Sequence, residues 1–261
     1  QVIGIASKDI VEGEHVHSHN LEFTEFEREF KINKQKNIEY KSENNFFFEG
    51  FKRKNGKAGT RNYIGLLSTV NCSATVVKKI ANNINNNPEL QKYDNIDGVV
   101  CLKHSSGCGM NNKGYGMKVF NQTIEGFKHH PNFSKVFVIG LGCECAQISL
   151  YKEEDDKVIY MNIQDEGGTK KIIESVSNQI FDMLPNLDAD KRVKIPVSEL
   201  IVALQCGGSD AYSGITANPA LGYASDLLVN QGGSTILSET PEIYGAEHLL
   251  IERAKNENII K

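Results

Sequence analysis

Five of the six cysteines directly follow predicted β-strands, beside glycine, serine or acidic residues: Cys72, Cys108, Cys143, Cys145 and Cys206. A single cysteine is most often a small buried hydrophobic residue. Five cysteines at corresponding positions favour chemistry instead, because ligands gather at the carboxyl ends of parallel strands. Cys101 differs, since it lies inside a predicted strand.

His104 and Cys108 form a His-x-x-x-Cys pair on a glycine-bearing turn. An imidazole and a thiolate at this spacing can share Fe(II) or Zn(II). The chain has no Cys-x-x-Cys pair, so the strong signature of a zinc ribbon is absent. An extended backbone would point Cys143 and Cys145 to opposite sides, and we assign Cys145 to packing. The predicted metal ligands are therefore His104, Cys108, Cys143 and Cys206.

Glycines in two of these turns let the backbone approach a ligand: Gly107 with Gly109, and Gly207 with Gly208. Backbone amides in such turns suit a carboxylate as well as a phosphate. The Gly140-Leu-Gly142 turn is similar to a dinucleotide fingerprint, but Cys145 stands at the third glycine position. We therefore do not expect a nicotinamide cofactor.

The elements that position these turns alternate along the chain from residue 51 onward. Apolar runs predict strands at 64–70, 98–102, 136–141, 158–163, 200–204 and 235–238. Amphipathic periodicity predicts helices at about 73–85, 116–127, 169–184, 218–230 and 247–256. This alternation predicts an α/β fold, with parallel-sheet, Rossmann-like layers and helices on both faces.

Four segments differ in composition. Residues 1–22 contain short alternating stretches, and 23–50 form a charged connector with scattered phenylalanines. Residues 51–190 form an α/β domain, and 191–261 begin a further α/β domain that we expect to continue beyond this sequence. As a strand, residues 15–20 would place three histidines on one face, which suits either an exposed polar edge or the presentation of ligands.

The bulk composition narrows the possible partners. A formal net charge of -4 argues against nucleic-acid binding, which needs a basic face. No apolar run is long enough to span a bilayer, and the N-terminus has no secretory signal pattern. Six scattered cysteines do not form a disulfide scaffold. We therefore expect a cytoplasmic protein with a small-molecule partner; the sequence leaves a homo-oligomer open.

Several segments together resemble the altronate/galactarate dehydratase family. The segments that carry the resemblance are 59–63, 68–72, 104–108, 140–144, 206–219, 241–242 and 245–247. The stretch Cys206-Gly-Gly-Ser-Asp210 is the most specific of them. Residues 1–22 are similar to the end of the family's small N-terminal β-clip (SAF) domain.

The resemblance implies a hydro-lyase that uses iron or manganese and converts a sugar acid into a 2-keto-3-deoxy acid. Proton removal beside a carboxylate builds up negative charge that a divalent cation can stabilise. The predicted catalytic residues are Asp210, Glu242 and Lys103. The predicted substrate-binding residues are Arg61, Ser209, Gly207, Gly208 and His17. Lys103 and Arg61 are equally compatible with plain surface charges.

Three alternatives stay open. The family also contains a sulfolactate sulfo-lyase branch, which eliminates sulfite. The cysteines and histidines could instead hold a structural zinc in a non-catalytic module. Cys72, Cys143 and Cys206 could hold an iron–sulfur cluster.

Overall fold

The computed structural model describes residues 4–23, 46–208, 212–254 and 256–260. The chain divides into two compact units, which are described separately. The sheet unit comprises Glu43–Leu200 with Gln231–Gly233. The split unit comprises Gln1–Ser42, Ile201–Asn230 and Ser234–Lys261.

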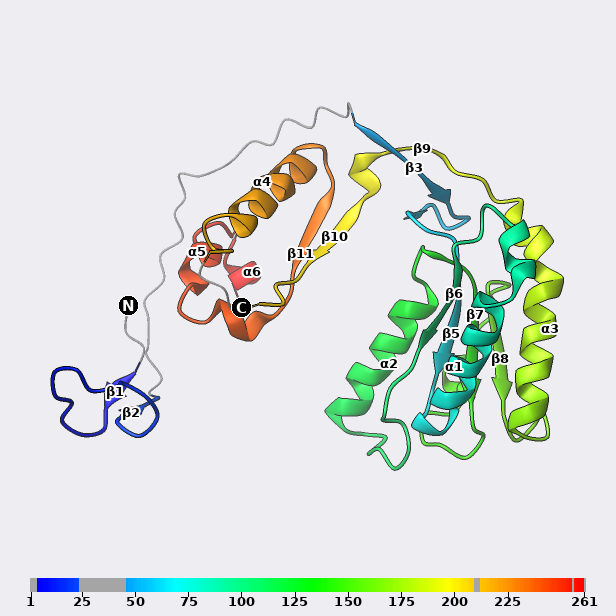
Figure 1. Cartoon of the computed structure of the whole chain (residues 1–261), viewed down its shortest axis with the longest axis horizontal. Helices are drawn as coiled ribbons and strands as arrows, with labels where there is room; N and C mark the ends of the chain where they lie inside the picture. The colour runs from blue at the N-terminus through cyan, green and yellow to red at the C-terminus, as the bar shows by residue number, and fades with distance from the viewer. Residues whose placement is uncertain (1–3, 24–45, 209–211, 255, 261) are drawn as a thin grey trace. The chain divides into compact units, whose positions relative to one another are not determined.

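A four-stranded parallel sheet in the order β6-β5-β7-β8 forms the centre of the sheet unit. Its strands are β5 (Tyr63–Ser68), β6 (Gly98–Leu102), β7 (Phe133–Gly140) and β8 (Val158–Asn162). Five of the six β5 residues are buried, as expected for a central strand covered on both faces. All four strands run in the same direction, so their carboxyl ends lie together at the lower end of Figure 1.

Helices cover both faces of this sheet: α1 (Asn71–Asn85), α2 (Tyr115–Lys128) and α3 (Thr169–Asp188). Helices α1 and α3 share the larger core with inward residues of the strands, such as Leu66 and Phe137. Helix α2 packs on the other face, and Figure 1 shows α2 and α3 on opposite sides of the sheet. This arrangement confirms the predicted α/β class with helices on both faces.

The sheet unit also contains a small antiparallel sheet in the order β4-β3-β9, whose strands come before and after the parallel sheet along the chain. It consists of β3 (Phe47–Lys52), β4 (Ala58–Gly59) and β9 (Val193–Pro196). Strand β9 pairs with β3, from Phe47 opposite Pro196 to Gly50 opposite Val193. Residues 191–196, which the sequence placed with the following domain, therefore lie in the sheet unit. Short helices η1 (Pro88–Lys92), η2 (Ile148–Leu150) and η3 (Val197–Glu199) complete this unit.

The split unit contains two small pairs of strands. Strands β1 (Ile5–Ala6) and β2 (Leu21–Glu22) are antiparallel, whereas β10 (Ile201–Leu204) and β11 (Ser234–Leu237) are parallel. Its helices are α4 (Ala217–Asn230), η4 (Thr240–Ile243), α5 (Glu247–Ile251) and α6 (Glu257–Ile260). No residue of α4, β10 or β11 is buried, so the described residues of this unit do not enclose a hydrophobic core. The predicted SAF assignment of residues 1–22 stays a prediction.

Among the described residues, every helix is too short or too polar to cross a bilayer.

Candidate functional site

Two loops meet at the carboxyl edge of the sheet unit, one after β5 and one after β6. The amide of Asn71 donates to the carbonyl oxygen of Ser106 at 2.8 Å. Gly107 has a φ of +98°, and a Cβ placed there would lie 2.3 Å from the carbonyl oxygen of Thr69. Only glycine fits this approach without displacing the backbone. The turn that carries Cys108 is therefore fixed against the end of β5.

Glu144 organises the loop after β7. Its side chain is nearly fully buried, and one carboxylate oxygen accepts from the Thr69 hydroxyl at 2.7 Å and the Leu141 amide at 3.0 Å. The other oxygen accepts from the Gly142 amide at 2.7 Å. Burial raises the pKa of this carboxyl, but the hydrogen bonds outweigh it and hold the pKa below its usual value. Glu144 thus joins the ends of β5 and β7 as an ionised group.

The backbone amides of the Gly140-Leu-Gly142 turn donate hydrogen bonds to the carboxylate of Glu144. The amides of Leu141 and Gly142 point at Glu144, in the place where a dinucleotide fold would present amides to a phosphate. A Cβ on Gly140 would lie 2.4 Å from the Glu144 oxygen, so glycine is required there. The turn therefore binds an internal anion and presents Cys143, which is exposed, at its tip.

His104 connects the ends of β5 and β6. Its Nε2 lies 2.8 Å from the carbonyl oxygen of Ser68, and its Nδ1 accepts from the Ser106 amide at 3.1 Å. This pattern corresponds to a neutral ring with the proton on Nε2. The ring also stands edge-on to Phe120, with 4.8 Å between centroids. Both ring nitrogens are engaged, so His104 can ligate a metal only if one of these bonds breaks.

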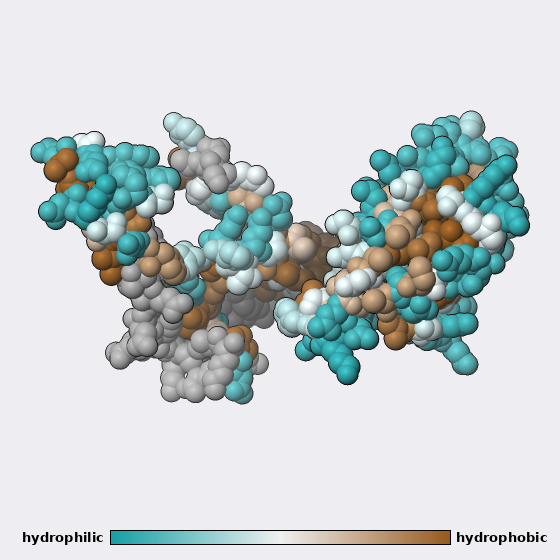
Figure 2. Space-filling view, turned by 90° about the horizontal axis from the view of Figure 1, so that it is seen from below, coloured by the Kyte–Doolittle hydropathy of each residue, from teal (hydrophilic) through white to brown (hydrophobic). Residues whose placement is uncertain are grey.

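Exposed thiols lie at this edge in the first turn of α1 and in the loops after β6 and β7: Cys72, Cys108, Cys143 and Cys145. Cys101 is half-buried within β6. Figure 2 views the molecule from the side of this edge and shows hydrophobic residues of the sheet unit surrounded by hydrophilic ones. Within the described chain, His104, Cys108 and Cys143 are not a group whose three ligand atoms lie within 4.8 Å of one another. The structure brings their loops together without closing a metal site.

Glu125, His129 and Glu153 do form such a compact group in the described residues. However, Nζ of Lys128 lies 2.8 Å from Glu125 and 3.1 Å from Glu153, and it also donates to the carbonyl of Tyr151. Lys128 is 1% exposed. Burial lowers the pKa of its ammonium, but the bonds to the two carboxylates outweigh this and raise it. A fixed ammonium therefore already forms ion pairs with both acids of this group, and its positive charge opposes a cation placed between them.

The two predicted cations for the substrate carboxylate lie at opposite ends of the sheet. Lys103 is exposed at the carboxyl edge, directly after β6. Arg61 precedes β5 at the amino edge, where its guanidinium lies 3.0 Å from Asp97. A strand of six residues separates the two edges by about 20 Å. Arg61 is therefore not brought together with His104 and the thiols.

In the split unit, Glu239 organises the turn that carries Cys206. One Glu239 oxygen accepts from the Cys206 amide at 2.9 Å and the other from the Gln205 side chain at 3.0 Å. These hydrogen bonds lower the pKa of the exposed Glu239 carboxyl. Glu242 follows in η4 and is exposed, as are Gly207 and Gly208. Ser209 and Asp210 lie outside the described residues.

Sequence reasoning missed both glutamates as organising residues. Each is an acid at or just after a strand end, Glu144 after Cys143 and Glu239 after β11. An acidic residue at that position is the sequence feature that could have revealed them, because its carboxylate can accept hydrogen bonds from the free amides of the adjacent turn. His17 lies in a bend, and residues 15–20 do not form the strand for which an exposed edge and a ligand-presenting role were the two interpretations.

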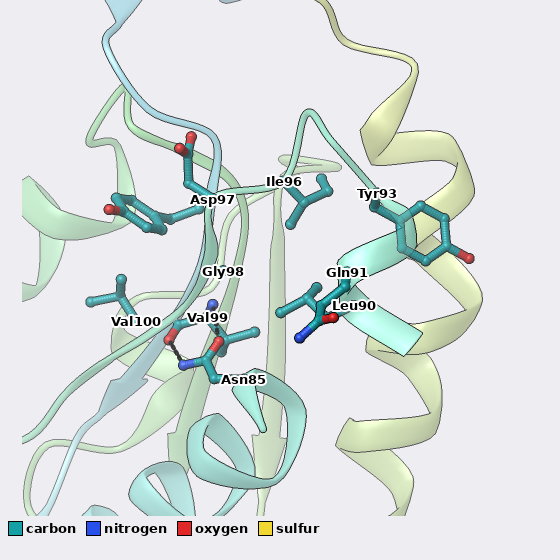
Figure 3. A pocket seen from close by; sticks show the side chains of 10 residues that line it. Asn85, Leu90, Gln91, Tyr93, Ile96, Asp97, Gly98, Val99 and Val100 are labelled. Atoms are coloured by element: carbon teal, nitrogen blue, oxygen red, sulfur yellow. Dashed lines mark hydrogen bonds between the residues drawn. The ribbon is translucent and has the colours of Figure 1, made fainter. Parts of the chain in front are cut away.

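A groove of about 470 Å³ lies away from the thiols, beside the start of edge strand β6. Tyr63, Tyr93, Leu90 and Ile96 contribute to its lining. Figure 3 shows the Asn85 side chain at this groove, bonded to the backbone of β6. Its side-chain nitrogen donates to the carbonyl oxygen of Val99, and its side-chain oxygen accepts from the backbone amide of Val99, both at 2.8 Å. Asn85 thus takes the place of a further strand at the sheet edge.

We expect Asn85→Ala to lower the free energy of unfolding of the sheet unit by about 1–2 kcal/mol, because two edge-strand hydrogen bonds are lost. Asn82→Ala is the matched control, since Asn82 is an exposed residue of the same helix. Both substitutions replace asparagine by alanine in the same helix, so a larger loss for Asn85→Ala in urea unfolding reports the two bonds. Equal stability of the two variants would contradict the role of Asn85.

Two family models match the chain. The second domain of D-galactarate dehydratase/altronate hydrolase matches residues 50–188. The C-terminal part of D-galactarate/altronate dehydratase matches residues 197–261. The gap between these matches, residues 189–196, contains β9, and the polypeptide passes from the sheet unit to the split unit shortly afterwards, between Leu200 and Ile201.

Curated relatives cover nearly the whole chain. It is 37% identical to an altronate dehydratase of Bacillus subtilis over 98% of the chain and 52% of that protein. It is 32% identical to an altronate dehydratase of Escherichia coli over 98% of the chain and 51% of that protein. A galactarate dehydratase (L-threo-forming) of Escherichia coli is 39% identical over 83% of the chain and 43% of its own length. The chain thus spans about half the length of these relatives.

Proposed function

Because the chain belongs to the family of D-galactarate dehydratases and altronate hydrolases, we propose that it forms part of a hydro-lyase acting on a sugar acid. The substrate would be of the altronate or galactarate type, and the product a 2-keto-3-deoxy acid. The observation that supports a reaction centre here is the joined carboxyl edge, where Glu144, Gly107 and His104 fix three loops that expose thiols.

The donor chemistry of this edge fits a divalent cation. Cys108 and Cys143 are free and exposed, and Cys206 is free and exposed in the split unit. Thiolate donors favour Fe²⁺ over Mn²⁺, which prefers oxygen ligands. We propose Cys108 and Cys143 as ligands from the sheet unit and Cys206 as a ligand from the split unit, with His104 added only if it releases Ser68 or Ser106. A bound Fe²⁺ would act as a Lewis acid towards the negative charge that develops next to the substrate carboxylate.

The remaining predicted residues would move protons and hold the substrate. A base takes the proton from C2, and an acid protonates the 3-hydroxyl as it leaves as water. The resulting enol then tautomerises to the 2-keto acid. Asp210 and Glu242 are the proposed acid and base, in an order that we leave open, and Lys103 is the proposed partner of the substrate carboxylate. Gly207, Gly208, Ser209 and His17 are the proposed further contacts, whereas Arg61 pairs with Asp97 instead.

We expect Cys143→Ser and Cys206→Ser to reduce bound iron by more than about tenfold after anaerobic loading, because each change removes a soft ligand. Cys101→Ser is the control, since Cys101 is half-buried in β6 and is not a proposed ligand. Elemental analysis measures the metal. Unchanged iron in both test variants would remove the cysteines from the ligand set, and absorption near ~400 nm would indicate a cluster instead.

The reaction itself is tested by incubating the iron-loaded protein with a panel of aldonic and aldaric acids. The amount of 2-keto acid formed is measured, and the Cys143→Ser protein serves as the inactive comparison. A protein that retains iron but forms no 2-keto acid from any of these substrates would argue against the proposed activity. Release of sulfite from sulfolactate would indicate the sulfo-lyase branch instead.

A further inference from the structure

The loop between β1 and β2 is built around one buried asparagine. Asn20 is fully buried, and its side-chain oxygen accepts from the His17 amide at 2.8 Å. Its side-chain nitrogen donates to the carbonyl of His15 at 3.1 Å and to Glu14 at 3.3 Å. The backbone amide of Asn20 also donates to the carbonyl of His17. A single side chain thus fixes the backbone at both ends of a short histidine-bearing loop.

This loop presents three exposed imidazoles close together. The ring centroids of His15 and His17 lie 5.3 Å apart, and those of His15 and His19 lie 6.5 Å apart. All three side chains are exposed, although the backbone below them is held by Asn20. An ordered loop with three exposed histidines within five residues is a pattern typical of metal binding.

The spacing agrees with shared coordination of one ion. Two imidazoles bound to one tetrahedral cation at about 2.0–2.1 Å have ring centres roughly 5 Å apart. The His15–His17 pair already has this separation, whereas His19 must move closer to both rings. Exposed side chains can make that adjustment by rotation about χ1 and χ2. We therefore propose that His15, His17 and His19 form a binding site for a divalent first-row transition metal.

Neighbouring groups are arranged to orient these rings. The Ser18 hydroxyl lies 3.0 Å from Nδ1 of His17, which leaves Nε2 of that ring for the ion. Glu14 lies 3.8 Å from Nε2 of His19, and its other oxygen accepts from the Val11 amide. A hydrogen bond such as that between Ser18 and His17 fixes the orientation of a ligating histidine, whereas Glu14 acts on His19 only through its charge. Three imidazoles leave a coordination position for water or a small anion, as in open zinc sites.

The Glu125–His129–Glu153 group gives an internal comparison. Its ligand atoms are closer together than those of the histidine loop, but the buried ammonium of Lys128 already forms ion pairs with both of its carboxylates. In the histidine loop, no described lysine or arginine forms an ion pair with Glu14 within 4.0 Å. A cation bound by Glu125 and Glu153 would meet the positive charge of Lys128, which lies 2.8 and 3.1 Å from these carboxylates and disfavours that group as a site. Imidazole ligands select Zn²⁺, Co²⁺ and Ni²⁺ over Mg²⁺ or Ca²⁺.

Cobalt binding to the chain tests this site, after the exposed thiols have been alkylated with iodoacetamide to remove sulfur ligands. Isothermal titration should give one Co²⁺ per chain, and His15→Ala or His17→Ala should each weaken binding by more than about tenfold. Asn20→Ala should weaken it by about 10–100-fold, through loss of loop order rather than loss of a ligand. His129→Ala is the matched control and should leave the dissociation constant unchanged.

Modification by diethyl pyrocarbonate, read by mass spectrometry, locates the ion. Co²⁺ should protect His15, His17 and His19 but leave His129 reactive. Unchanged affinity in both His15→Ala and His17→Ala, or protection of His129 alone, would overturn the proposal. The three loop histidines are exposed, so their removal should not unfold the chain. This site does not rest on the proposed hydro-lyase activity, because the measurement is metal binding without substrate.

Discussion

Replacing Glu144 by glutamine is expected to lower the free energy of unfolding of the sheet unit by about 2–3 kcal/mol, because buried amides lose their partner. The carboxylate accepts from Thr69, Leu141 and Gly142, using both of its oxygens. A glutamine has only one acceptor oxygen, and its NH₂ group would face a donor. The turn that presents Cys143 would then separate from the end of β5.

This contribution depends on pH in a direction that the structure determines. The pKa of Glu144 is lowered in the folded state, because its hydrogen bonds outweigh the effect of burial. Its stabilisation is therefore present above the unfolded-state pKa of about 4.3 and is lost as the pH falls through the lower folded-state value. The stability difference between wild type and Glu144→Gln should be constant near neutral pH and should shrink in acid.

Urea unfolding across this pH range measures the difference, and hydrogen exchange at the Leu141 and Gly142 amides reports on the turn itself. Thr69→Val removes only one of the three hydrogen bonds and should cost about 1 kcal/mol. Glu174→Gln is the control, since the Glu174 side chain is 62% exposed and its ion pair with Lys170 is 4.0 Å long. A Glu144→Gln protein as stable as Glu174→Gln would falsify the role of the buried carboxylate.

The parallel sheet was predictable because its strands are covered on both faces. Continuous apolar runs such as those of β6 and β7 are the direct result of that burial. Strands β3 and β9 were missed, because their pairing joins residues more than 140 positions apart. Helix α3 extends beyond the predicted end at Leu184 although Pro185 follows. A proline there loses only one helical hydrogen bond, and buried Leu184 and partly buried Leu187 hold the last turn to the core.

Part of the candidate site was also predictable, namely the strand ends at which ligands collect. The exposed thiols of Cys72, Cys108 and Cys143 lie there, as expected. What the sequence could not show is which polar groups bind one another. His104 has the residue type of a ligand, yet both of its nitrogens bind the backbone. Such partners depend on tertiary contacts between separate loops, which periodicity and spacing do not encode.

Gly107→Ala is expected to be the most disruptive single-methyl addition at this edge. The new Cβ would lie 2.3 Å from the carbonyl oxygen of Thr69 and 2.8 Å from Cα of Val70. Both neighbours are backbone atoms, so the steric clash can be removed only if the turn after β6 moves away from the end of β5. In addition, the φ of +98° is unfavourable for any residue with a side chain. We expect a loss of about 3–4 kcal/mol in the free energy of unfolding, comparable with other strained or overpacked substitutions.

Gly109→Ala separates the two contributions. Gly109 lies two residues further in the same turn and also has a positive φ of +66°, but a Cβ there would meet nothing within 4 Å. This variant carries only the conformational cost, about 1 kcal/mol, and should leave the contact between Asn71 and Ser106 intact. The difference between the two alanine variants in urea unfolding therefore measures the collision with Thr69. If Gly107→Ala proves no less stable than Gly109→Ala, the two loops are not packed as described, and the position of Cys108 beside the end of β5 loses its support.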